Sequence, residues 1–300
     1  MCTFQGEKHL LEQLESIKNQ TYQNWRLFVS DDGSTDNTLV ILRNFQASLE
    51  PGQMEIFDGP RRGYADNFMN LLLNPSIEGS FYAFSDQDDI WFDEKLSVAV
   101  SKLKSLSEKN DRPAAYASAR ALASYDLKRI GTEGACDLIP SFNNALVQNI
   151  AGGNTIVLNN IMREILLKIG AVKVVSHDWW VYLVCTGAEG GFYYDKKPSL
   201  LYRQHSNNLI GAADSWGARL SRFHQFLGGR YRRWIDTNLK ALEQAKWSFT
   251  KDNTATMERF ALLRDKRAPA RVLELFQSGI QRQSWLGTLG LLLACLLKRI

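Results

Sequence analysis

Short apolar runs alternate with amphipathic segments through the first 90 residues of the chain. The apolar residues of 10–17 recur at helical spacing, and the run 25–30 (WRLFVS) predicts a strand. The same reasoning predicts a helix over 39–45, a strand over 54–57, a helix over 63–72 and a strand over 81–84. Strands that alternate with helices in this way indicate an α/β fold with a mostly parallel central sheet flanked by helices.

The alternation weakens after residue 110. We expect a strand within 114–124, helices over 161–169 and from 177 to about 185, and closing strands over 192–194 and 200–205. From residue 215 onward the pattern predicts mainly helix, rich in Arg, Trp and Phe. We therefore expect a first domain over 1–214 and a helical C-terminal extension over 215–300.

The same two parts of the chain differ in net charge. Residues 215–300 carry 16 Lys and Arg against 6 Asp and Glu, whereas 1–214 carry 20 against 26. Basic residues interleaved with aromatic ones on helices suit an anionic membrane surface, although a solvated helical face has the same composition. The apolar run 285–297 is 13 residues long, which is too short to span a bilayer. No nucleic-acid-binding motif is present, so nucleic acid is not an expected partner.

Cysteine usage and overall composition exclude several classes of protein. The four cysteines are widely spaced, with no C-x-x-C pair, so we expect neither a zinc site nor a disulfide framework. A reducing compartment fits this pattern, and we expect no signal peptide, which together predict a cytoplasmic protein. A content of 45% hydrophobic and 23% charged residues is that of an ordinary globular protein.

Two acidic turns follow two of the predicted strands. Asp31 and Asp32 end the strand of 25–30, and Asp86, Asp88 and Asp89 follow the strand of 81–84. In open α/β sheets, ligands bind at the carboxyl ends of the strands. Two carboxylates spaced as Asp86 and Asp88 suit one hard cation, Mg²⁺ or Mn²⁺, with phosphate oxygens as further ligands. The alternative is a solvated turn that caps the following helix.

These turns belong to a larger set of motifs. In chain order they are Cys2 to Glu7 (CTFQGE), Gln20 to Tyr22 (QTY), Asp31 to Asp36 (DDGSTD), Ser85 to Trp91 (SDQDDIW), His177 to Trp180 (HDWW) and Tyr202 to Asn208 (YRQHSNN). Over about 1–212, this order resembles the family 2 glycosyltransferases of GT-A fold. The last three motifs resemble the rhamnosyltransferase-type members of that family.

The resemblance implies a nucleotide-sugar site over the strand ends. Phe4 would pack against the base, and Asp32 would accept a hydrogen bond from the imide N–H of a pyrimidine. Helix capping is the alternative role for Asp32. Gly63 and Asn67 would pass near the ribose.

The resemblance also implies a metal site and a closing flap. Asp86 and Asp88 match the D-x-D motif whose metal stabilises the leaving diphosphate, and Asp86 would also contact the nucleotide. In the flap, Arg203 would pair with phosphate and His205 would bind the metal or the diphosphate.

On the acceptor side, the resemblance assigns the catalytic base to Asp178. An inverting transfer needs a group that removes the proton of the acceptor hydroxyl. The start of a helix would lower the pKa of Asp178, whereas burial beside Trp179 and Trp180 would raise it, so the sequence leaves the direction open. Simple N-capping is the alternative role. The other residues implied on this side are Gly153, Asn154, His177 and Trp179.

The predicted function is an inverting, metal-dependent glycosyltransferase for a surface polysaccharide. The best candidate donor is dTDP-L-rhamnose, the acceptor is a saccharide or a lipid-linked one, and the enzyme would sit peripherally at the inner face of the plasma membrane. One alternative is a nucleotidyltransferase, which would need a phosphate loop richer in Gly and Lys than Gly6-Glu7-Lys8. The other is an inactive glycosyltransferase-like scaffold. An apolar strand usually precedes the Thr-Phe-Gln-Gly segment in the family, so we expect a truncated first strand here, or a translation start further upstream.

Overall fold

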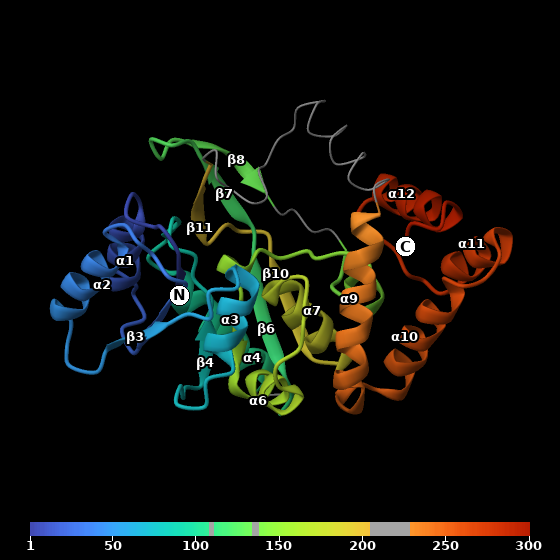
Figure 1. The fold of residues 1–300 in the computed structure, drawn as a ribbon, viewed down its shortest axis with the longest axis horizontal. Helices are drawn as coiled ribbons and strands as arrows, with labels where there is room; N and C mark the ends of the chain where they lie inside the picture. Colours follow the sequence, from blue (N-terminus) through green and yellow to red (C-terminus); the bar gives the residue numbers. More distant parts are fainter. Residues whose placement is uncertain (108–110, 134–137, 205–228) are drawn as a thin grey trace.

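The computed structural model describes residues 1–107, 111–133, 138–204 and 229–300. Two sheets lie side by side at its centre (Figure 1). The first has the order β1-β2-β3 and is parallel throughout. Its strands are β1 over Cys2–Thr3, β2 over Leu27–Asp31 and β3 over Met54–Asp58. It meets the second sheet where Cys2 N donates to Ser85 O at 3.3 Å.

The second sheet has the order β10-β6-β9-β4. Its strands are β4 over Phe81–Ala83, β6 over Ala114–Ser118, β9 over Val157–Asn159 and β10 over Gly191–Asp195. The β6–β10 pair is parallel, but β9 runs antiparallel to both β4 and β6. The sheet is therefore mixed at β9, a strand that the sequence pattern does not reveal.

A third, smaller sheet has the order β5-β11-β7-β8 and stands above the second (Figure 1). Its strands are β5 over Ile90–Trp91, β7 over Arg120–Ala123, β8 over Arg129–Glu133 and β11 over Leu200–Arg203. The single strand expected within 114–124 is two strands, β6 and β7, which belong to different sheets. The β5–β11 pairing ties the end of the SDQDDIW motif to Leu200 and Leu201, the two residues directly before the YRQHSNN motif.

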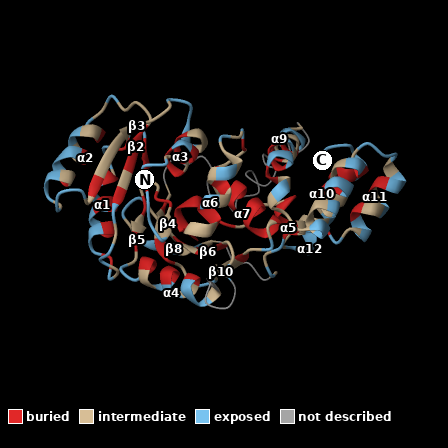
Figure 2. Ribbon diagram, turned by 90° about the horizontal axis from the view of Figure 1, so that it is seen from below, coloured by how far each residue is buried: buried red, intermediate tan, exposed pale blue. Residues whose placement is uncertain are grey.

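Helices cover both faces of the second sheet (Figure 2). α4 (Lys95–Ser107) packs against Tyr116 and Val157 in one hydrophobic cluster. On the other side the largest cluster gathers α3 (Tyr64–Leu72), α5 (Phe142–Ala145), α6 (Asn160–Ile169) and α7 (His177–Gly187). α1 (Leu10–Lys18) and α2 (Thr38–Ala47) pack with β2 and β3 in a cluster of their own. The apolar stripe on α1 explains its placement, because Leu10, Leu14 and Ile17 are all buried.

The C-terminal part is helical, as its sequence predicts. It comprises α9 (Arg230–Ala245), α10 (Lys251–Leu263), α11 (Ala268–Gln277) and α12 (Trp285–Leu296). α9 packs beside α7, with the Trp179 and Trp234 rings edge to face at 6.4 Å between centroids. Tyr231 of α9 donates its hydroxyl to Val147 O at 2.6 Å. The expected boundary between 214 and 215 lies outside the described residues.

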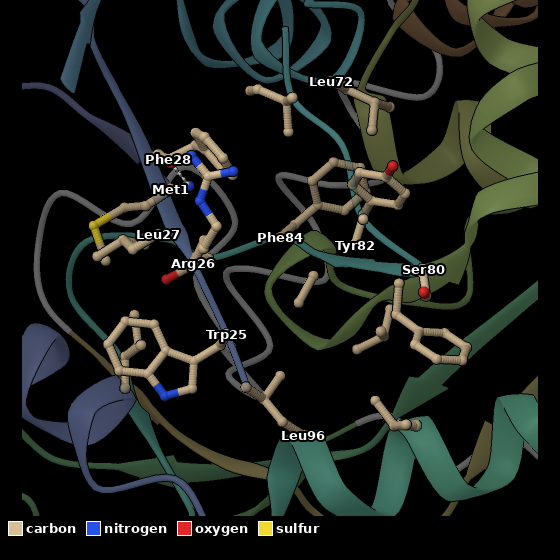
Figure 3. A pocket seen from close by; sticks show the side chains of 18 of the residues that line it. Met1, Trp25, Arg26, Leu27, Phe28, Leu72, Ser80, Tyr82, Phe84 and Leu96 are labelled. Carbon is tan, nitrogen blue, oxygen red and sulfur yellow. Dashed lines mark hydrogen bonds between the residues drawn. The ribbon is translucent and has the colours of Figure 1, made fainter. Parts of the chain in front are cut away.

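A cavity of about 370 Å³ separates part of β2 from β4 (Figure 3). Leu27 and Phe28 line it from β2, and Tyr82 and Phe84 line it from the β4 segment. Met1 closes one end, where its α-amino group donates to Phe28 O at 2.7 Å and burial lowers the pKa of that amine. None of the described site residues lines this cavity. The two-residue β1 pairs with β2 and bonds to Ser85 after β4, and the cavity reaches this junction, since Met1 and Ser85 both line it.

Among the described residues, no helix combines the length and the apolar character needed to cross a bilayer.

Candidate functional site

The first acidic turn is held by its own leading carboxylate. Asp31 is 4% exposed and accepts hydrogen bonds from Thr3 Oγ1 at 2.8 Å and from Ser34 N at 2.8 Å. It also accepts from Ser34 Oγ at 2.6 Å. Since all these partners lie in the turn or in β1, Asp31 fixes the path of the chain that leaves β2.

Asp32 points instead toward the loop that precedes α3. Its Oδ1 accepts from Arg61 N at 2.5 Å and its Oδ2 accepts from Gly63 N at 2.9 Å. Gly63 has a φ of 92°, a left-handed conformation that suits glycine, and α3 begins at the next residue. The carboxylate therefore does not cap α2, which follows its own turn. It fixes the loop that leads into α3.

Asn67 is buried, with 1% exposure, in the second turn of α3. Its Oδ1 accepts from Ser30 Oγ at 2.6 Å and its Nδ2 donates to Ser30 O at 3.0 Å. These bonds hold α3 against β2 and leave the side chain facing the protein interior. Asn67 thus positions α3 against β2, and the proximity of this segment to a ribose stays a prediction.

The second acidic turn carries the paired carboxylates at the end of β4. Asp86 and Asp88 are half-buried. Burial and the neighbouring Asp88 raise the pKa of Asp86 to about 7, while the Arg120 guanidinium opposes this rise. Two carboxylates that repel each other in this way suit a divalent cation, which would neutralise both. The described residues hold no group of three or more His, Cys, Asp or Glu arranged for a metal.

Asp89 is part of a buried network that the sequence does not reveal. Its Oδ2 accepts from Asn154 Nδ2 at 2.7 Å, and Lys95 Nζ donates to Asn154 O at 2.7 Å. All three side chains are 2% exposed or less. Burial lowers the pKa of Lys95 to about 7. Asn154, expected beside the acceptor, instead holds the acidic turn from beneath.

One signal for this network exists in the sequence. Lys95 is the first residue of α4, where a positive charge opposes the helix dipole. A lysine placed against that rule, directly after an acidic turn, indicates a partner elsewhere in the fold.

Two arginines surround the same turn. Arg203 is 4% exposed; it forms an ion pair with Glu12 and donates to Tyr125 O at 2.8 Å and to Asp88 O at 3.4 Å. Its guanidinium therefore braces the backbone of the acidic turn, and the expected phosphate contact is not its described role. Arg120, which the sequence did not indicate as a site residue, pairs with Glu133 at 2.8 Å. Its positive charge opposes the rise in the pKa of Asp86.

Asp178 is half-buried in the first turn of α7. The N-cap residue is Ser176, and Asp178 Oδ1 accepts from Trp179 N at 2.7 Å. Partial burial and the carboxylates of Asp178 and Asp86 raise the pKa of Tyr64. The two carboxylates therefore act on a common space beside Tyr64, although they lie on separate segments of the chain.

His177 is buried in an aromatic cage next to Asp178. Its ring stacks on Phe68 at 4.0 Å between centroids and meets Phe84 edge-on at 4.7 Å. Neither ring nitrogen has a hydrogen-bond partner among the described residues. A Cβ on Gly153 would lie inside contact distance of His177 Nε2, so the missing side chain of Gly153 makes room for His177. His177 is thus a buried support for the start of α7.

Trp179 is also a packing residue. It is 5% exposed, and its Nε1 donates to Ala145 O at 2.7 Å. Its ring lies between α5 and α9, so the expected acceptor contact of Trp179 is replaced by a contact between helices. Phe4 differs, since 56% of it is exposed beside the acidic turns. His205, the expected third metal ligand, lies outside the described residues.

The burial of His177 predicts a pH dependence of stability. Burial lowers its pKa from 6.5 to about 4, so on acidification the unfolded chain takes up this proton first. The contribution to stability is therefore fully present above about pH 6.5 and is lost as the pH falls toward 4. When the pH is lowered from 7 to 4.5, the free energy of unfolding of His177→Gln, measured with urea, should rise by about 2 kcal/mol relative to that of wild type. A stability difference that stays constant with pH would contradict the buried, neutral histidine.

Known proteins resemble this chain in sequence and in fold. The family model for glycosyl transferase family 2 matches residues 1–119. The dTDP-rhamnosyl transferase RfbG of Shigella flexneri is 31% identical over 81% of this chain and 84% of its own length. The UDP-Glc:alpha-D-GlcNAc-diphosphoundecaprenol beta-1,3-glucosyltransferase WfgD of Escherichia coli is 32% identical over 34% of this chain and 39% of its own length.

Solved structures show the same architecture at low sequence identity. The mannosyltransferase PcManGT of Pyrobaculum calidifontis, in complex with GDP-Man and Mn²⁺, superposes with a TM-score of 0.50 at 17% identity, over 99% of this chain and 85% of its own. Residues 1–349 of TarS from S. aureus, in complex with UDP, give a TM-score of 0.52 at 13% identity, over 99% and 86%. Both share with this chain the GT-A fold that its sequence predicts. The architecture agrees with the family-model match and with the Shigella flexneri relative, which aligns over most of both chains. The chain therefore belongs to glycosyl transferase family 2.

Proposed function

We propose that this glycosyltransferase inverts the configuration at the anomeric carbon of the sugar that it transfers and that it uses a divalent cation. The sugar is L-rhamnose, which moves from dTDP-L-rhamnose to a lipid-linked polysaccharide. The observation that carries the proposal is that Asp178 and Asp86 come from separate segments yet lie close enough for both carboxylates to raise the pKa of Tyr64, whose ring lies 6.2 Å from that of His177, the neighbour of Asp178. A transferase of this kind needs charge compensation on the leaving side of the sugar and a proton acceptor on the attacking side.

On the leaving side, Asp86 and Asp88 would hold Mg²⁺ or Mn²⁺. The bound cation would compensate the negative charge of the diphosphate as the bond between sugar and phosphate breaks. The supporting residues keep these carboxylates in place: Asn154 holds Asp89, and Arg203 holds the Asp88 carbonyl. The solved mannosyltransferase with GDP-Man and Mn²⁺ supports use of a divalent metal.

On the attacking side, Asp178 would accept the proton of the acceptor hydroxyl while that oxygen bonds to the anomeric carbon. The C–O bond to the diphosphate breaks as this bond forms, so the configuration at the anomeric carbon inverts. Asp178 lies in the first turn of α7, and its bond from Trp179 N holds one carboxylate oxygen. The other oxygen then carries the proton acceptor function.

The donor is inferred from the Shigella flexneri relative, whose name specifies dTDP-rhamnosyl transfer. The Escherichia coli relative, named for a diphosphoundecaprenol-linked substrate, supports a lipid-linked acceptor. The test is a thermal-shift panel of dTDP, UDP and GDP with Mn²⁺, followed by hydrolysis of the matching sugar nucleotides. We expect dTDP and dTDP-L-rhamnose to give the largest responses. A preference for UDP- or GDP-sugars would overturn the donor assignment.

We also propose that α12 contacts an anionic membrane. Its exposed apolar side chains form what we call the α12 surface: Trp285, Leu286, Leu289, Leu293, Leu296 and Leu297. Lys298 and Arg299 follow directly and are exposed. An apolar helix face bordered by basic residues suits the boundary between headgroups and acyl chains.

Membrane binding should depend on both features of this surface. Co-sedimentation with vesicles that contain anionic lipid should fall as salt rises, because exposed charges are screened over about 8 Å at physiological ionic strength. The double substitution Leu289→Glu with Leu293→Glu should weaken binding at least about tenfold, since it removes two apolar side chains from the contact. Val40→Glu on α2, at the far end of the molecule from α12, is the matched control (Figure 1). Binding that responds neither to salt nor to the double substitution would refute the membrane role.

A further inference from the structure

Gln87 lies between the two proposed metal ligands, and its side-chain amide pairs with the backbone of Phe4. Its Oε1 accepts from Phe4 N at 2.8 Å, and its Nε2 donates to Phe4 O at 2.9 Å. The amide thereby pairs with Phe4 as a residue of a neighbouring strand would, and two bonds fix its plane. We call this contact the Gln87–Phe4 bridge.

The segment that carries Phe4 depends on contacts of this kind. Gln5 has a φ of 51°, a left-handed conformation that a non-glycine residue keeps only where its surroundings hold it. On one side, Gln5 N donates to Ser34 Oγ at 2.9 Å and Gln5 Nε2 donates to Thr35 Oγ1 at 2.9 Å. On the other side stands Gln87. The segment is thus held by hydrogen bonds to both acidic turns.

Gly6 makes room for the bridge. A Cβ built on Gly6 would lie inside contact distance of Gln87 Oε1. No left-handed φ requires glycine at this position, so space for Gln87 explains its missing side chain. An alanine there would displace the flexible end of Gln87 while the backbone keeps its path.

We propose that Gln87 is a positioning residue that couples the nucleoside half of the donor site to its diphosphate half. The inference rests on the proposed function, in which Phe4 packs against the base and Asp86 and Asp88 meet the diphosphate through a cation. The direct backbone link between these halves is the hydrogen bond from Cys2 N to Ser85 O, which is long at 3.3 Å. The Gln87–Phe4 bridge adds two shorter bonds, two residues further along each segment.

The bridge needs a donor and an acceptor on one planar group, which makes it chemically testable. Glu at this position keeps acceptors but cannot donate to Phe4 O, and Met keeps the shape with neither function. Gly6→Ala attacks the same contact from the opposite side. If the bridge is the common element, Gly6→Ala and Gln87→Met will not be additive, because the second change finds the bridge already broken.

The experiment measures the affinity for dTDP with Mn²⁺, the affinity for thymidine without metal, and the KM and kcat for dTDP-L-rhamnose. In Gln87→Met, Gln87→Glu and Gly6→Ala, we expect dTDP with Mn²⁺ to bind about tenfold more weakly and KM to rise in step. Thymidine binding and kcat should stay within about threefold of wild type. The Gln87→Met/Gly6→Ala double variant should match either single variant.

The outcomes separate the possible failures. Unchanged dTDP affinity in all three variants overturns the inference, and so does an equal loss for thymidine and dTDP, which indicates general disorder of the site. Additive effects in the double variant also overturn it. If wild type itself shows no Mn²⁺-dependent dTDP binding, the proposed function falls, and this inference falls with it.

Discussion

Replacing Asp178 with Asn should lower kcat by at least about a hundredfold while donor binding stays near wild type. Asn has nearly the shape of Asp, and its side-chain oxygen can keep the bond from Trp179 N that the carboxylate accepts at 2.7 Å. What Asn lacks is a basic oxygen for the proton of the acceptor hydroxyl. General base catalysis typically contributes about 10² to 10⁴ in rate, so its loss should appear in kcat.

The structure sharpens the control for this experiment. Since Ser176 and not Asp178 is the N-cap of α7, loss of a cap does not explain a large effect of Asp178→Asn. Urea unfolding of the variant should match wild type within about 1 kcal/mol. A variant that still transfers sugar within a few-fold of wild type would remove Asp178 from the base role. Asp89 and His177 are poor replacements, because both are buried within the protein.

Replacing Asp88 with Ala should abolish the metal-dependent part of nucleotide binding. In wild type, dTDP with Mn²⁺ should raise the melting temperature more than dTDP with EDTA. With one carboxylate gone, Asp86 alone faces the cation and the diphosphate charge is poorly compensated. The two melting temperatures of Asp88→Ala should then coincide.

The matched control is Asp265→Ala, which removes an exposed carboxylate from the C-terminal part. It should keep the full difference between Mn²⁺ and EDTA. If wild type responds equally to dTDP with Mn²⁺ and with EDTA, the metal assignment fails regardless of the variants. If Asp88→Ala keeps the wild-type difference, the cation is bound elsewhere.

Local pattern was sufficient for most of the elements in the first half of the chain. The apolar stripe of α1 and the alternation through α3 predicted the α/β class, because periodicity reports which face of an element is buried. The sequence pattern did not predict strand β9. Its three residues are all buried, so they show no alternation that distinguishes a short strand from the neighbouring helix.

Some residues of the candidate site could likewise be placed from the sequence, and others could not. Paired carboxylates that directly follow an apolar run must lie at a strand end, so Asp32, Asp86 and Asp88 could be placed from sequence. The partners of other motif residues could not. Arg203 is held by Glu12 from α1 and by the backbone of the acidic turn, and these lie 191 and 115 positions away in the chain.

By itself, the sequence determined the fold class, the edge of the sheet that carries the site, and the residue types available for metal and proton chemistry. Only the tertiary structure decided which of those residues are buried and which segments their side chains contact. Asn154 and Trp179 were expected beside the acceptor, but their side chains bond to Asp89 and to Ala145 inside the protein, and Gly153 lies against the His177 ring. The physical reason is that a motif fixes the position of a residue along the backbone, whereas burial and hydrogen-bond partners depend on segments brought together by folding.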